Sequence, residues 1–439
     1  MEDSVWRTVY LRRIFARESA GIGNAQLIHA DSYPKQRGEL LLLVPQPTGL
    51  VTLCGLNELP RTDSPLPFHA PRAEHVIEHK KILLMGSGGI GDALFLTPAA
   101  RAVRNNFPRA RISLFFTGNG HLVFKRNTSV DDVIPAPFAN HWGRDKPEEG
   151  LARGNYDLAI IFNRDAAYRD LAQHAGITSI WRIEDIHERI VPERPTQAQD
   201  HTSGTYVSIR RDAESEHSVA MNLDLLRAAG LAVDSTDMEM PIQPEDESAA
   251  ADLLRREGIA PSEQLIAFHP GTALLNRPRI GRLVRRARLI VKGGTFVYDG
   301  RCWPLESYAQ LGNLIATTFR SRIVITGGGY EGDLAAKIAR LSRFRPIDLT
   351  GKTDIGQLGA VLKQTRLVVA GDTGVLHLAM AMKVPVVGIY GSTHVSRTGP
   401  WGPKEQFLAV GSARHMQRIS VEEVFDAVKS LLRSNVARR

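Results

Sequence analysis

The sequence has few cysteines and lacks any long apolar run. Its 439 residues include two cysteines, Cys54 and Cys302, which argues against a disulfide-stapled scaffold and a cysteine-rich metal site. No apolar run approaches the roughly 20 residues that a helix needs to cross a bilayer. The chain begins Met1-Glu2-Asp3, which is acidic where a signal peptide carries positive charge. We therefore expect a cytoplasmic protein.

The overall composition is that of a globular protein with a basic excess. Hydrophobic residues make up 43% and charged residues 23% of the chain, and its length predicts two or three domains. The formal net charge of +8 favours a polyanionic partner, such as anionic lipid or a phosphorylated glycolipid. The sequence shows no helix-turn-helix, zinc-finger or aromatic-basic RNA-binding pattern, so we do not expect a nucleic-acid partner.

The chain divides into a short first region and two longer ones. Residues 1–75 carry short apolar runs broken by Gly, Pro and Asn, which predicts a small β-rich extension ending in a proline-containing linker. Strand and helix patterns then alternate through residues 80–235 and again through 245–415. A polar, proline-bearing stretch at residues 235–248 separates the two, and residues 416–439 predict a C-terminal helix. The fold class is therefore α/β, with two doubly wound, Rossmann-like domains that each bind ligands at the carboxyl edge of a parallel sheet.

The most informative motif joins a strand to a helix in the second of these domains. Asp372, Thr373 and Gly374 follow an apolar strand and precede an apolar helix that contains His377. The first amides of such a helix lack partners and the helix dipole is positive there, which favours an anion. Simple capping of the helix by Asp372 and Thr373 is the alternative interpretation.

A second glycine-rich turn follows the first strand of the other domain. Residues 86–91 satisfy the dinucleotide-binding fingerprint, so an NAD(P)-dependent oxidoreductase is an alternative function. That fingerprint requires an acid about 20 residues further on, to hold the ribose hydroxyls. The strand at residues 111–116 ends without one, and the next acid is Asp131. The dinucleotide interpretation is therefore the weaker one.

Four segments together carry a family resemblance. They are residues 89–104 with a Gly-Asp turn and a Thr-Pro helix, residues 269–272, residues 301–308 with Trp-Pro, and residues 372–403. Their order and separation resemble the heptosyltransferase family, glycosyltransferase family 9, over residues 80–415. These inverting, nucleotide-sugar-dependent enzymes have the GT-B fold, in which two Rossmann-like domains face a cleft. The resemblance implies that residues 80–235 bind the acceptor and residues 245–415 the donor.

The resemblance also implies roles for individual residues. Asp92, in the turn with Gly89 and Gly91, would be the base that deprotonates the acceptor hydroxyl, whereas on its own it would be interpreted as a helix cap. The donor-binding residues it implies are Thr272, Arg301, Glu331, Asp372, Thr373, Gly374 and His377. A solvated helix-start acid remains the alternative for Glu331, and a packing histidine the alternative for His377.

Two departures from the family pattern bear on function. Arg301 stands where the family usually has lysine, which keeps the positive charge but replaces a point charge with a planar fork. Between Thr272 and Arg301 lies a longer segment, with no acid before Asp299, whose apolar residues recur at helical spacing. Its cations include Arg279, Arg282, Arg285 and Arg286, so it predicts a basic amphipathic helix that either docks on an anionic membrane or packs on the donor domain.

The predicted function is transfer of a sugar, by resemblance heptose from ADP-heptose, onto a lipopolysaccharide-core or related acceptor with inversion. Since no Asp-x-Asp follows a strand in either domain, we expect neither a metal nor another cofactor. A GT-B-like protein that binds a nucleotide sugar without transferring it is the non-enzymatic alternative.

Overall fold

The computed structural model forms two compact units, Met1–Glu74 and His75–Arg439. In the first unit, strand β1 (Leu42–Pro45) pairs antiparallel with β2 (Val51–Cys54). The structure describes residues 42–45, 51–54, 79–136, 147–185, 206–211, 216–271, 302–391, 393–411 and 415–436.

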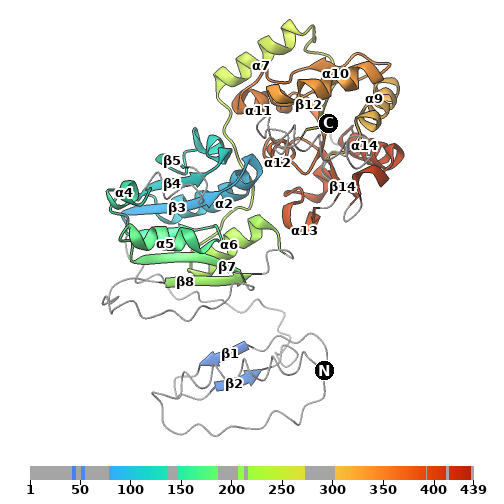
Figure 1. Ribbon diagram of the computed structural model, residues 1–439. Helices are drawn as coiled ribbons and strands as arrows, with labels where there is room; N and C mark the ends of the chain where they lie inside the picture. The colour runs from blue at the N-terminus through green and yellow to red at the C-terminus, as the bar shows by residue number, and fades with distance from the viewer. Residues whose placement is uncertain are drawn as a thin grey trace, which may run out of the picture. The chain divides into compact units, whose positions relative to one another are not determined.

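The second unit contains two six-stranded sheets, and every strand pair in them is parallel (Figure 1). The first sheet has the order β5-β4-β3-β6-β7-β8, and the second β11-β10-β9-β12-β13-β14. In the first sheet the strands are β3 (Lys81–Ser87), β4 (Arg111–Thr117), β5 (Asp132–Ala136), β6 (Leu158–Ile161), β7 (Ser179–Asp185) and β8 (Tyr206–Arg211). In the second they are β9 (Leu265–His269), β10 (Arg322–Ile325), β11 (Ile347–Asp348), β12 (Thr365–Gly371), β13 (Val386–Tyr390) and β14 (Phe407–Gly411).

Both sheets are covered by helices, as the alternation of strand and helix predicts. The α-helices of the first half are α2 (Ile90–Asn106), α4 (Pro147–Ala152), α5 (Ala166–His174) and α6 (Ser218–Ala228). Those of the second half are α7 (Pro244–Arg256), α9 (Leu305–Phe319), α10 (Gly332–Leu341), α11 (Ile355–Lys363), α12 (Gly374–Ala381), α13 (Val395–Thr398) and α14 (Val421–Val436). None of the helices in the described ranges combines the length and the apolar content of a membrane span.

Continuous apolar runs explain why the central strands lie inside. In β3, Ile82 and Leu84 pack into one core, while Leu83 and Met85 pack into another on the opposite face. The central strands of the second sheet divide their side chains in the same way. Because parallel strands buried on both faces need no polar alternation, such runs identify them in the sequence.

Helix α2 begins at Ile90, so it includes the residues 90–92 that the sequence predicts as a Gly-Asp turn before the helix. The glycine-rich start hides the helical pattern, because Gly89 is the N-cap residue and the first turn follows it directly. Pro98 lies inside the helix and has no N–H to offer the carbonyl of Leu94. The Thr97 hydroxyl donates to that carbonyl at 2.8 Å instead, which explains why the Thr-Pro pair is compatible with a continuous helix.

The helices on either side of the predicted boundary at residues 235–248 have clear start signals. Helix α6 begins at Ser218, because His217 caps it by accepting from the Val219 N–H at 3.2 Å. Helix α7 begins at Pro244, inside the stretch 235–248 that the sequence predicts as a boundary. A proline in the first turn, followed by three acids, suits the start of a helix.

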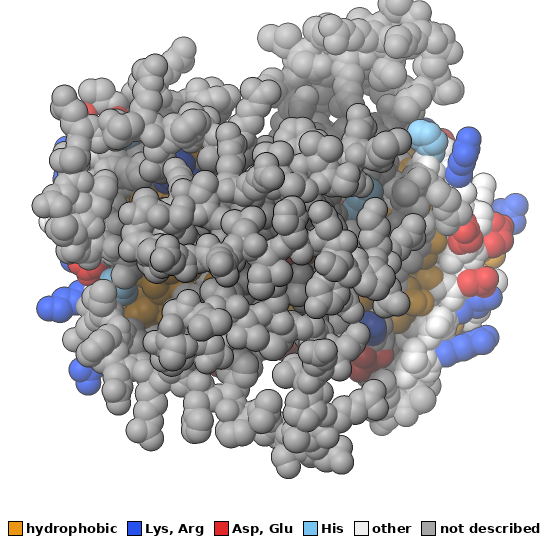
Figure 2. All heavy atoms as spheres, turned by 90° about the horizontal axis from the view of Figure 1, so that it is seen from below, with side chains coloured by type: hydrophobic (Ala, Val, Ile, Leu, Met, Phe, Trp, Pro, Cys, Tyr) orange, Lys and Arg blue, Asp and Glu red, His pale blue; other side chains and the backbone are white. Residues whose placement is uncertain are grey.

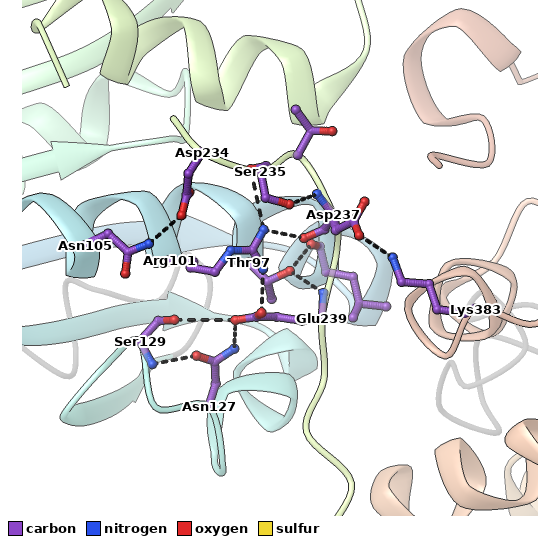
Figure 3. A network of polar contacts seen from close by, with 12 residues as sticks. Thr97, Arg101, Asn105, Asn127, Ser129, Asp234, Ser235, Asp237, Glu239 and Lys383 are labelled. Carbon is purple, nitrogen blue, oxygen red and sulfur yellow. Dashed lines mark hydrogen bonds and ion pairs between the residues drawn. The ribbon is translucent and has the colours of Figure 1, made fainter. Parts of the chain in front are cut away.

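An extended segment without regular structure, residues 231–243, connects the two halves; we call it the connecting strap (Figure 3). Arg101 of α2 donates to the Glu239 carboxylate and, at 2.9 Å, to the carbonyl of Asp237. From the second half, the Lys383 ammonium reaches the Asp237 carboxylate at 2.6 Å. The strap is therefore attached to both halves.

Figure 2 shows one face of the molecule. Where side chains are coloured at its right edge, Lys and Arg lie next to Asp and Glu. Interspersed charge of both signs is typical of a solvated surface.

Candidate active site

The helices that follow the two central strands meet at their first turns. Helix α2 follows β3 and α12 follows β12, and each of these strands lies where the strand order of its sheet reverses. The approach is so close that a Cβ on Gly374 would lie 3.1 Å from the Gly91 nitrogen. A Cβ on Gly91 would lie 2.8 Å from the His377 ring. Because glycine at both positions has no side chain, the two helix starts can approach this closely. They lie at the carboxyl edges of the two sheets, which is where doubly wound folds bind ligands.

Asp92 is the third residue of α2 and not part of the preceding turn. Its Oδ2 atom accepts the Gly89 N–H at 2.8 Å, so the capping interaction is present. The backbone at Gly88 has φ +118°, and a Cβ there would come within 2.2 Å of the same oxygen. Capping occupies one carboxylate oxygen, and the side chain remains exposed.

The Asp92 side chain lines a cavity of about 630 Å³. Most of the wall comes from the first half, including Ser87, Phe116, Asn163 and Asn222. One lining residue, Arg397, comes from α13 of the second half. The size suits a sugar-sized ligand, since ligand pockets span roughly 300–1,000 Å³.

The electrostatic setting of Asp92 is that of an enclosed carboxylate that water still reaches. Desolvation by the surrounding protein raises the pKa of Asp92, and the charge of Asp372 adds to this. The Gly89 amide and the charges of His377 and Arg397 act in the opposite direction, and the net pKa is above its ordinary value. A raised carboxylate pKa is a property that favours a general base, because a stronger base accepts a proton more readily.

Asp372 and its neighbours form the corresponding site on the second half. Burial alone would raise the pKa of Asp372, but the His377 imidazole and the hydroxyls of Thr393 and Thr398 outweigh it and hold the pKa below its ordinary value. The His377 Nε2 atom lies 3.8 Å from Asp372 Oδ1, and the Thr398 hydroxyl donates to Oδ2 at 3.2 Å. Asp372 is therefore a preformed carboxylate at the start of α12.

The capping interpretation of Thr373 is not what the structure shows. Thr373 is the N-cap residue of α12, but its side chain makes no capping hydrogen bond. Its buried Oγ1 atom has no partner among the described residues. His377 is buried and packs its ring edge-on against Phe95 of the first half, with the centroids 4.5 Å apart. The buried ring of His377 therefore packs between the halves, as the alternative interpretation of this histidine proposes, and it lies beside the Asp372 carboxylate.

Glu331 is not the solvated acid of the alternative interpretation. It is 2% exposed, and its Oε2 atom accepts the Gly328 N–H at 2.7 Å. The other oxygen, Oε1, has no partner within the described part of the chain, and a Cβ on Gly271 would lie 1.6 Å from it. Burial raises the pKa of Glu331 to about 7. An unpartnered buried carboxylate oxygen at a strand end is suited to accept a hydrogen bond from a ligand hydroxyl.

The end of the segment 372–403 makes contacts with the first half that sequence reasoning did not predict. The His217 ring stacks on Trp401 with centroids 4.4 Å apart, and its Nε2 atom lies 3.1 Å from the Gly399 carbonyl. The Ser218 hydroxyl donates to the Arg397 carbonyl at 3.4 Å. No local pattern marks these contacts, because they join residues about 180 positions apart.

Several predicted site residues lie outside the described residues. They are Thr272, Arg301 and the four arginines Arg279, Arg282, Arg285 and Arg286. Within the described ranges, no group of three or more His, Cys, Asp or Glu side chains is placed to hold a metal ion.

Two parallel, doubly wound sheets whose carboxyl edges meet at paired helix starts define the GT-B fold, which solved heptosyltransferase-family structures share. The model of glycosyltransferase family 9 (heptosyltransferase) matches residues 194–428, and the chain belongs to this family. It is thus a glycosyltransferase, as the sequence predicts, and the oxidoreductase alternative loses its support.

Sequence relatives and solved structures align with most of the chain. Lipopolysaccharide heptosyltransferase 3 of Escherichia coli K12 is 24% identical over 332 residues, covering 71% of this chain and 82% of that protein. The glycosyltransferase family 9 structure from Veillonella parvula aligns with a TM-score of 0.63 and 20% identity, covering 81% of this chain and 98% of that one. The E. coli heptosyltransferase WaaC, solved with ADP-2-deoxy-2-fluoro heptose, aligns at 0.54 and 17% identity, covering 81% and 99%.

Proposed function

We propose that this protein transfers a heptose from ADP-heptose to a lipopolysaccharide-core acceptor with inversion at the anomeric carbon. The observation that carries the proposal is the exposed carboxylate of Asp92 in a sugar-sized cavity, next to the start of the helix that follows Asp372. The names of the relatives support the choice of sugar and acceptor. In this proposal residues 80–235 bind the acceptor and residues 245–415 bind the donor.

The reaction assigns one task to each side of the cleft. Asp92 takes the proton of an acceptor hydroxyl as that oxygen attacks the anomeric carbon. The bond to the nucleoside diphosphate breaks at the same carbon, and the leaving oxygen keeps the electron pair. The first amides of α12, at Thr373 and Gly374, and the cation Arg301 would stabilise that developing charge. Asp372 would bind hydroxyls of the donor sugar, and Glu331 those of the ribose.

The direct test combines a panel of nucleotide sugars with delipidated lipopolysaccharide-core oligosaccharides. With ADP-heptose we expect the mass of an acceptor to rise by one heptose residue, and the configuration of the new linkage by NMR to be inverted. Binding of the donor without any mass change would favour the non-enzymatic alternative. Transfer of a different sugar would correct the donor.

The leaving group is proposed to be stabilised without a metal. Activity should therefore survive incubation with EDTA, because fixed amides and cations do not depend on a removable ion. Loss of activity on chelation, with recovery on adding Mg²⁺ or Mn²⁺, would show that a metal neutralises the diphosphate.

The basic segment between Thr272 and Arg301 is proposed to bring the enzyme to a lipid-linked acceptor at the cytoplasmic face of the membrane. Each arginine near an anionic bilayer contributes on the order of 1 kcal/mol to binding. Replacing Arg279, Arg282, Arg285 and Arg286 with Gln should release the protein from anionic vesicles in a flotation assay, while activity on a soluble acceptor is kept. Loss of that soluble activity would instead place the arginines in the cleft.

A further inference from the structure

Arg397 is a cation of the second half that lies in the cavity of the first. It belongs to α13, which follows β13, yet its side chain lines the same cavity as Asp92. The charged residues of that cavity also include Arg164 and Asp165, at the carboxyl end of β6. Arg397 is exposed, so its guanidinium is accessible from the cavity.

The backbone that carries Arg397 is attached to both halves. Its carbonyl accepts the Ser218 hydroxyl of the first half at 3.4 Å. The next residue, Thr398, donates its hydroxyl to Asp372 at 3.2 Å, and its carbonyl accepts the Tyr390 hydroxyl at 3.1 Å. These contacts fix the base of the arginine side chain between the proposed donor-sugar carboxylate and the acceptor cavity.

Filling the cavity would make an isolated carboxylate harder to ionise. An acceptor that displaces water removes the solvation of Asp92 and disfavours its charged form. The charge of Asp372, from the start of α12, acts in the same direction, while His377 and Arg397 oppose it. Of these two, His377 is buried, whereas Arg397 is an exposed cation that lines the cavity.

We propose that Arg397 is a positioning residue, supplied by the donor-binding half, that keeps the Asp92 carboxylate ionised and in place while the acceptor occupies the cavity. The inference rests on the proposed role of Asp92 as the base. It implies that the base functions fully only when the two halves are together, because the acid and its cation come from different halves. The Thr398–Asp372 contact ties the arginine to the donor side of the site.

The test is the pH dependence of kcat at saturating donor and saturating acceptor. The acid limb of this profile reports the ionisation of the base in the complex that holds both substrates. In Arg397→Gln we expect the acid limb to move by ~0.5–1 pH unit to higher pH, since a nearby opposite charge lowers a carboxylate pKa. At pH values on the acid limb, the Arg397→Gln rate would then be ~3–10-fold lower than that of the unchanged enzyme, and on the plateau at higher pH the two rates would be nearly equal. Arg397→Lys should restore most of the shift, and Arg418→Gln, an exposed cation of the same half outside the cavity, should leave the profile unchanged.

Two results separate this inference from the function it rests on. Near-normal turnover in Asp92→Asn, measured in parallel, would show that Asp92 is not the base and would contradict the proposed function. An inactive Asp92→Asn together with an unmoved acid limb in Arg397→Gln would overturn the role of Arg397 alone. If Arg397→Gln is too slow to profile, NMR titration of ¹³C-labelled aspartate carboxyls, with Asp92 assigned by its Asn variant, measures the same shift without turnover.

Discussion

The two halves use the same short turn to place an acid, with opposite results. In the first half the Gly89 N–H donates to Asp92, the third residue of its helix, and in the second the Gly328 N–H donates to Glu331 in the same relative position. The Asp92 side chain is exposed in a cavity, whereas Glu331 is 2% exposed. The longer side chain of Glu331 points back under the strand ends, where Gly271 leaves room for it. The backbone motif therefore positions a carboxylate, and its surroundings decide whether that carboxylate is suited to proton transfer or to holding a ligand.

The largest expected effect comes from removing basicity on the exposed side. Asp92→Asn keeps the shape and can still accept the Gly89 N–H, but it cannot take a proton. We expect kcat to fall ~100-fold or more while the donor KM stays nearly unchanged, measured by steady-state kinetics. Asp165→Asn is the matched control, because it changes another carboxylate of the same cavity that caps α5. That variant should lose less than about tenfold, and an equal loss in both would assign the effect to the charge of the cavity.

The corresponding change at the buried acid Glu331 should weaken binding of the donor. Glu331→Gln weakens a charge-assisted hydrogen bond to a donor hydroxyl, which is worth about 1.5 kcal/mol or more. We therefore expect the donor KM to rise ~10-fold with a much smaller change in kcat. Asp333→Asn, at an exposed acid in the first turn of α10, should behave like the unchanged enzyme. A fall in kcat at constant donor KM would show that Glu331 does not bind the donor.

The smallest effect concerns stability without a ligand. Burial raises the pKa of Glu331 from 4.5 to about 7, so the folded state binds this proton more tightly than the unfolded chain does. The stability it contributes is complete below about pH 4.5 and is lost as the pH rises through 7. Glu331→Gln should therefore melt a few degrees higher than the unchanged protein at pH 8, and the difference should shrink toward pH 5. A melting temperature difference that does not depend on pH would argue against a protonated Glu331.

The sequence predicts the central strands well and the peripheral elements poorly. Strands β3, β9 and β12 are continuous apolar runs, so burial on both faces identifies them. Strand β14 is partly exposed along its whole length, and α7 is rich in acids and arginines, so neither gives a clear hydrophobic pattern. The start of α2 was missed for a different reason, because its glycines serve the contact with α12 and not the propensity of the helix.

The site shows the same division between local and distant signals. The acids at residues 92, 331 and 372 stand in motifs that a strand, a turn and a helix place near a sheet edge, so their neighbourhood could be predicted. The contribution of Arg397 could not, because it depends on a contact across the two halves that no nearby residue encodes. The unpartnered oxygen of Glu331 likewise depends on the absence of a side chain at Gly271, on another strand.

The connecting strap limits how this enzyme can be recombined. Its acids are matched to Arg101 on one side and to Lys383 on the other. A chimera that takes one half from a relative and joins it within residues 231–243 would separate these partners and leave charges without their counterions. A chimera that exchanges donor specificity between such enzymes should therefore take the strap, Arg101 and Lys383 from the same parent. The contacts of the strap with both halves are then kept.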